Sequence, residues 1–155
     1  MLKEKAKELN RKYYQFTFPF PPDRGNRTGH SRWEKYGSKK HGRMSWHEFA
    51  IQSGYLNPQR IVNSQTLTYA IISAHFISPK RRRDFDNLVA MMKWPLDYLR
   101  QRRWISNDSA KRIWPIAFPT QRLAKNGESP KLVIEVMESN KKEVESLCAG
   151  MCGTK

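Results

Sequence analysis

Two aspartates one residue apart, Asp84 and Asp86, end the basic run "KRRRDFDNL" at residues 80–88. In an extended segment, residues i and i+2 point to the same side, so the two carboxylates would converge. Like charges held close together repel unless a cation lies between them or one group is protonated. Such hard oxygen ligands suit Mg²⁺, which one or two carboxylates commonly hold together with water and substrate phosphate. The spacing therefore predicts a magnesium site that acts on phosphate.

The cations before the aspartates fit the same chemistry. They would bind the phosphates that flank a scissile phosphate held on the metal. The four residues concerned are Lys80, Arg81, Arg82 and Arg83. A plainer interpretation stays open, in which Asp86 caps a helix and Asp84 pairs with a neighbouring arginine. D-x-D is a short pattern that often arises by chance.

Hydrolysis of a phosphodiester at a metal favours a third carboxylate and a cation for the developing charge. Asp108, in "WISNDSAKR", lies in an expected turn that could return toward the first two aspartates. Lys93 follows Asp86 by seven residues, which places it within roughly 20° of the same helix face. The alternative for Lys93 is a surface lysine whose stem covers apolar neighbours.

These segments together resemble one family. "RRRDFDNL", "MKWPLDYL" and "WISNDS" are similar to motifs of the RusA family of Holliday-junction resolvases. The resemblance implies a small dimeric α+β nuclease that cuts four-way DNA junctions with Mg²⁺. It also implies that Asp84, Asp86 and Asp108 are metal ligands and that Lys93 is the lysine needed for activity.

One spacing departs from the family pattern, which is D-N-L-x-K. The lysine position of that pattern is Ala90 here, whereas Lys93 precedes "WPLDYL" as the family lysine precedes its own motif. Three extra residues explain the difference and move the lysine by about 4.5 Å along a helix. The resemblance covers about residues 79–137, and the first half is similar only in pattern.

The charge of the whole chain agrees with a polyanionic partner. Its 155 residues include 29 Lys and Arg against 14 Asp and Glu, a formal net charge of +15. Nucleic acid is the first expectation and an anionic membrane surface the second. No apolar run approaches the roughly 20 residues of a spanning helix, and the N-terminus lacks a signal-peptide pattern. We expect an intracellular, cytoplasmic protein, nucleoid-associated or phage-encoded, with no membrane association.

The elements that must position these residues form one α+β domain. Strands are expected at 13–18, 66–77, 110–118 and 131–137, and helices at 43–54 and from Asp86 to about Arg103. The order β-α-β-α-β-β indicates an α+β domain with two main helices against a mixed β-sheet. The resemblance implies that this fold is RusA-like. Pro115 indicates an edge strand or a bulge. A charged lead (1–12) would precede the domain (13–137), and a loosely attached tail (138–155) would follow.

Weaker candidates complete the inventory. The loop at 19–33 could be a DNA-contacting arm with Arg24, Arg27 and Arg32 on phosphates, or a plain surface loop. Lys111 would touch backbone phosphate or solvent. The four histidines lack ligand spacing, and Cys148 with Cys152 has no nearby Cys or His partner for zinc.

Two classes of function remain open from the sequence. The first is a Mg²⁺-dependent endodeoxyribonuclease, with Mn²⁺ as a possible substitute and no small-molecule cofactor, that acts as a homodimer on branched DNA. The second is a non-catalytic basic nucleic-acid-binding module. Three carboxylates in positive surroundings favour the enzyme, because a protein that only binds phosphate gains nothing from them. A nuclease with less selectivity for branched DNA would use the same residues.

Overall fold

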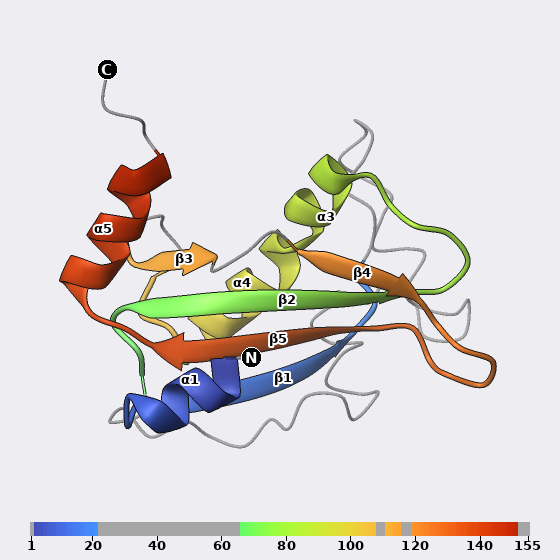
Figure 1. Ribbon diagram of the computed structural model, residues 1–155. Coiled ribbons are helices and arrows are strands. Elements are labelled where there is room, and N and C mark those ends of the chain that lie inside the picture. The colour runs from blue at the N-terminus through green and yellow to red at the C-terminus, as the bar shows by residue number, and fades with distance from the viewer. Residues whose placement is uncertain (1, 22–65, 108–110, 116–118, 152–155) are drawn as a thin grey trace.

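A computed structural model describes residues 2–21, 66–107, 111–115 and 119–151. The order of elements begins with helix α1 (Leu2–Glu8), strands β1 (Tyr13–Pro19) and β2 (Ala70–Ser78), and helices α3 (Phe85–Met91) and α4 (Lys93–Gln101). Strands β3 (Ile113–Pro115), β4 (Thr120–Leu123) and β5 (Lys131–Glu138) and helix α5 (Lys141–Met151) complete it. The expected α+β class with a mixed sheet is confirmed (Figure 1).

The strands form one sheet in the order β1-β5-β2-β3, and β4 also pairs with β2. β5 lies antiparallel to both β1 and β2, whereas β3 and β4 run parallel to β2. β3 pairs with the first three residues of β2, Ala70 to Ile72, and β4 with its last four residues, His75 to Ser78. Both short strands therefore line one edge of β2, and Pro115 lies in an edge strand as the sequence predicts.

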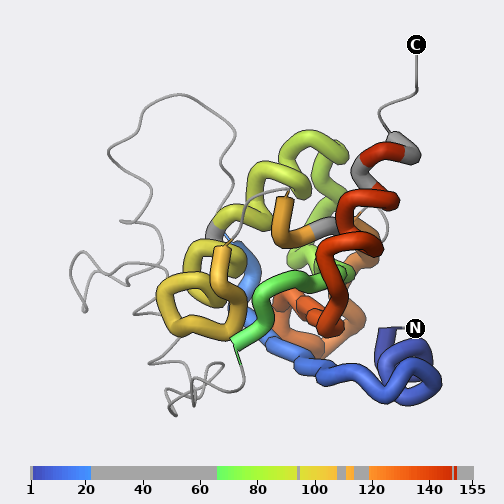
Figure 2. The backbone as a smooth tube through the Cα atoms, turned by 90° about the vertical axis from the view of Figure 1, so that its left-hand side faces the viewer, coloured from blue at the N-terminus to red at the C-terminus, as the bar shows by residue number. Residues whose placement is uncertain are grey.

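One face of the sheet packs against α3 and α4 and forms the main core. Alternate residues of β2 and β5 point into it, because side chains alternate along a strand. The fully buried members include Phe18, Phe76, Leu88, Leu99 and Ile134. The predicted aromatic row of β1 also packs on this side, with Tyr14 and Phe16 against Trp104. Figure 2 shows α4 on this side of the sheet and α1 on the other.

Helix α1 packs on one end of the opposite face. Leu2 and Ala6, one helical turn apart, pack on Ile71 of β2 and Met137 of β5. All four side chains are buried to 2% exposure or less. Farther along the same face, the strands carry polar side chains instead, including His75 of β2.

The helix expected from Asp86 to about Arg103 is wrong in one respect, because it is interrupted at Met92. Two helices replace it, and the predicted apolar stripe spans both. Pro95 supplies the physical reason: it has no N–H for the carbonyl of Met91, and its ring clashes with that carbonyl in a continuous helix. At the third residue of α4 the missing N–H costs nothing, because the first four N–H groups of a helix lack intrahelical partners.

The chain after β5 forms a helix that the sequence did not predict. Asn140 caps α5, since its side-chain oxygen accepts a hydrogen bond from the N–H of Glu143 at 2.9 Å. Val144 is fully buried, and Glu143 pairs with Arg11 between α1 and β1. Residues 141–151 therefore have tertiary contacts of their own.

The remaining predictions concern the bounds of individual strands and helices and the absence of a membrane-spanning helix. The strands at 13–18 and 131–137 are confirmed, and the long strand begins at Ala70. The helix expected at 43–54 lies outside the described residues. In the part of the chain that the structure describes, the helices are too short and too polar to cross a bilayer.

Candidate metal and nucleic-acid site

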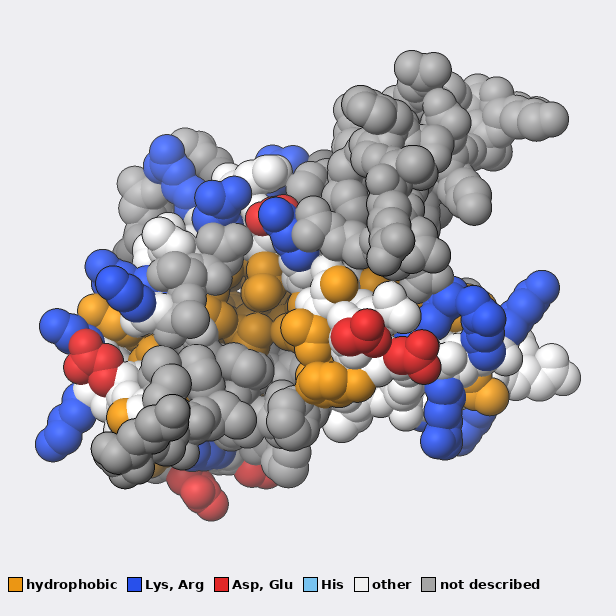
Figure 3. Space-filling view, turned by 90° about the horizontal axis from the view of Figure 1, so that it is seen from above, with side chains coloured by type: hydrophobic (Ala, Val, Ile, Leu, Met, Phe, Trp, Pro, Cys, Tyr) orange, Lys and Arg blue, Asp and Glu red, His pale blue; other side chains and the backbone are white. Residues whose placement is uncertain are grey.

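The basic run lies in an irregular segment between β2 and α3. Lys80, Arg81 and Arg82 are exposed, whereas Arg83 is half-buried. Figure 3 shows Lys and Arg side chains gathered at the end of the molecule where this segment lies in Figure 1, with acidic side chains beside them. Three of the four predicted phosphate-binding cations are therefore accessible to a large polyanion.

Arg83 is held by the protein itself. Its N–H donates to Oε1 of Gln121 at 2.8 Å, and its carbonyl accepts from Nε2 of the same side chain at 2.6 Å. Its guanidinium carbon lies 6.0 Å from the ring centroid of Phe20, and its Nε atom is buried. These contacts make Arg83 a packing residue, so we do not expect it to bind phosphate as its three neighbours would.

The two aspartates lie where the irregular segment becomes a helix. Asp84 is the N-cap residue of α3, with φ −65° and ψ 154°, and Asp86 is in the first turn. The expectation of extended backbone through both residues is therefore correct for Asp84 only, because the helix begins at Phe85. Both carboxylates are exposed.

An N-cap aspartate normally accepts a hydrogen bond from the N–H of the second or third helical residue. The Asp84 side chain makes no such bond. Within the described ranges, neither Asp84 nor Asp86 is paired with an arginine or lysine, although four cations precede them. The capping and ion-pair explanations of the two aspartates therefore lack support in these contacts.

Two of the three predicted Mg²⁺ ligands, Asp84 and Asp86, lie in the described part of the chain and are chemically suited to the ion. Two accessible carboxylates supply hard oxygen ligands, and Mg²⁺ usually retains several waters besides one or two carboxylates. Within the described ranges, no cluster of three or more His, Cys, Asp or Glu side chains could hold a metal. Asp108, the third predicted ligand, lies outside those ranges.

Lys93 is the first residue of α4, and its side chain is exposed. Met92, just before it, has a right-handed helical conformation. The interruption at Met92 falls between Asp86 and Lys93, so the two residues belong to different helices and the predicted single helix face does not join them.

Of the remaining predicted DNA contacts, one lies within the described residues and three lie outside them. Lys111 is exposed in a turn just before β3. Arg24, Arg27 and Arg32 lie outside the described residues.

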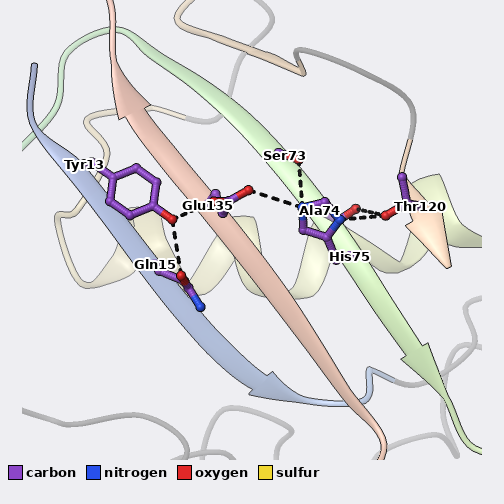
Figure 4. A network of polar contacts seen from close by, with 7 residues as sticks. All are labelled: Tyr13, Gln15, Ser73, Ala74, His75, Thr120 and Glu135. Carbon is purple, nitrogen blue, oxygen red and sulfur yellow. Dashed lines mark hydrogen bonds and ion pairs between the residues drawn. The ribbon is translucent and has the colours of Figure 1, made fainter. Parts of the chain in front are cut away.

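A second polar cluster, which the sequence analysis missed, lies on the sheet face opposite α3 and α4 (Figure 4). His75 bridges two strands: its Nδ1 is 2.6 Å from Oγ1 of Thr120, and its Nε2 is 3.2 Å from Oε2 of Glu135. Ser73 also contacts Nε2 at 3.1 Å, and the Tyr13 hydroxyl donates to Glu135 at 2.6 Å. Burial, followed by this bond to Glu135, raises the pKa of Tyr13.

This second cluster joins neighbouring strands through the two ring nitrogens of His75, with Nε2 facing Glu135 and Nδ1 facing Thr120. The cluster ties β1, β5, β2 and β4 together across the sheet.

Comparisons with known proteins add no relative. No protein-family model matches this chain, and no curated protein is significantly similar to it. The resemblance to the RusA family therefore depends on the motif residues alone.

Proposed function

We propose that this protein is a Mg²⁺-dependent endodeoxyribonuclease of the RusA type that resolves four-way DNA junctions in recombination and repair. The observation that carries the proposal is the pair of exposed carboxylates, Asp84 and Asp86, which lack protein partners within the described ranges and lie close in the chain to three exposed cations, Lys80 to Arg82. Exposed carboxylates beside a basic surface could bind a metal ion that also contacts a phosphate of the DNA.

Each group has a role in this proposal. Asp84 and Asp86 would hold Mg²⁺, which would supply Lewis-acid chemistry for hydrolysis of the phosphodiester. Lys80, Arg81 and Arg82 bind flanking phosphates and orient the strand. Lys93 stabilises the charge that develops on the phosphate oxygens in the transition state.

The proposed substrate, a four-way junction, implies that the protein acts as a homodimer. A four-way junction must be cut on two symmetric strands, so two sites related by a two-fold axis match it. The net charge of +15 on each chain favours association with DNA and gives it a strong dependence on salt.

The test compares three DNAs: a labelled four-way junction, a duplex of the same sequence and a single strand, each with and without Mg²⁺. We expect paired cuts in the junction only, and only with the metal. Equal cleavage of the duplex would indicate a less selective nuclease. Binding without cleavage by the wild-type protein would indicate a binding module and refute the proposal.

A further inference from the structure

The side chain of Gln121 satisfies both main-chain groups of one distant residue. Its carboxamide accepts from the N–H of Arg83 and donates to the carbonyl of Arg83, at 2.8 and 2.6 Å. The two residues are 38 positions apart in the sequence. A planar carboxamide with two short bonds leaves the main chain of Arg83 little freedom to rotate.

Gln121 can hold Arg83 because its own strand is fixed. β4 pairs with β2, with Gln121 opposite the buried Phe76. The hydroxyl of Thr120 lies on the other face of the sheet, where it contacts His75 at 2.6 Å. The Gln121 side chain therefore extends from a strand that is held by its backbone pairing with β2.

Because Arg83 is bonded to Asp84, fixing the main chain of Arg83 also restricts the backbone that carries the two carboxylates. Asp84 follows Arg83 directly, so the carbonyl that Gln121 holds belongs to the peptide bond that joins the two residues. The segment from position 79 to Asp84 has no strand or helix pairing of its own. The end of this segment is also held by the Arg83 side chain on Phe20 and by the start of α3.

We propose that Gln121 is a positioning residue, whose carboxamide fixes the main chain of Arg83 and thereby directs the carboxylates of Asp84 and Asp86. This inference rests on the proposed function, since it assumes that the two carboxylates bind a divalent cation. Groups that orient metal ligands commonly change metal affinity or activity by about 10- to 100-fold when they are removed.

The experiment uses three variants of the full chain. Gln121→Met keeps the length of the side chain and removes both hydrogen bonds. Gln121→Asn keeps the carboxamide but shortens its reach by about 1.5 Å. Thr120→Val is the matched control, because it removes a hydroxyl from the opposite face of the same strand. Thermal unfolding of each variant checks that the fold is retained.

The first measurement is calorimetric Mn²⁺ binding without DNA, with Asp86→Asn as the reference that identifies the site. We expect the Mn²⁺ dissociation constant to rise about tenfold or more in both Gln121 variants. Thr120→Val should stay close to wild type. The Mg²⁺ concentration for half-maximal junction cleavage should rise in parallel with the Mn²⁺ dissociation constant.

The second measurement is hydrogen exchange at the Arg83 amide, which should be faster in Gln121→Met and unchanged in Thr120→Val. Wild-type Mn²⁺ affinity in Gln121→Met, or an equal loss in Thr120→Val, would overturn the positioning role. No Mn²⁺ binding by the wild-type protein would overturn it as well. If the wild type binds Mn²⁺ but cuts no DNA, the proposed nuclease fails, and the affinity comparison still decides the role of Gln121.

Discussion

Arg82 and Arg83 are adjacent in the chain, but the structure predicts that replacing each by glutamine will affect the salt dependence of DNA binding differently. Arg82 is exposed with Lys80 and Arg81, whereas Arg83 is half-buried over Phe20. Each phosphate contact adds about 0.9 to the slope of log affinity against log salt. One contact is therefore worth about 3.5-fold in affinity between 50 and 200 mM salt, and three exposed cations about 40-fold. Arg82→Gln should flatten the slope by about 0.9, and Arg83→Gln should leave it unchanged.

The assay is fluorescence anisotropy of a labelled four-way junction, titrated without Mg²⁺ so that no strand is cut. A variant with Lys80, Arg81 and Arg82 all changed to glutamine should lose about 2.7 from the slope, the sum of three contacts. Arg83→Gln should instead lower the thermal unfolding temperature, because its guanidinium packs against Phe20. An unchanged slope in Arg82→Gln, or an equal flattening in Arg83→Gln, would refute the assignment of phosphate contacts by exposure.

Three further predictions concern catalysis and stability. Asp86→Asn should abolish Mg²⁺-dependent cleavage in a junction assay and leave binding equal or tighter, because a negative charge is removed; cleavage at the wild-type rate would exclude Asp86 as a ligand. Lys93→Ala should slow single-turnover cleavage at saturating protein by about 100-fold, and an equal loss in Lys111→Ala would show that the lysine register is mistaken. Tyr13→Phe should cost about 1–2 kcal/mol in denaturant unfolding at neutral pH, since it removes a hydrogen bond to the Glu135 carboxylate. Burial and the bond to Glu135 raise the pKa of Tyr13 above its ordinary value of 10.0, so this stability is present below that pH and is lost as the pH rises above it. Tyr13→Phe should accordingly lose less stability than wild type on alkaline titration, and a parallel loss would argue against the bond.

Sequence periodicity predicted the strands and helices that bury one of their faces in the core. Tyr14, Phe16 and Phe18 alternate in β1 and pack on one side, and the stripe through Leu88 and Leu99 lies in the core. Such patterns are local, because the side-chain period of a strand or helix depends only on its own backbone. The interruption at Met92 also had a local signal, Pro95, which the sequence analysis did not use.

Elements without a strong apolar pattern were missed for the same reason. β4, with the sequence "TQRL", has polar side chains at three of four positions and becomes a strand because β2 offers it an edge. α5 is rich in charge and is held by few buried residues, such as Val144. Their packing depends on surfaces that distant parts of the chain supply.

The sequence by itself determined which residues could do chemistry: the carboxylates of Asp84 and Asp86, the cations before them, and the excess of positive charge. Only the tertiary structure decided which of these side chains are accessible and what holds them. Arg82 and Arg83 are the same residue type in the same run, yet one is exposed and the other is fixed by Gln121 and Phe20. Burial and hydrogen bonding come from residues far apart in the chain, so no local pattern distinguishes two adjacent arginines.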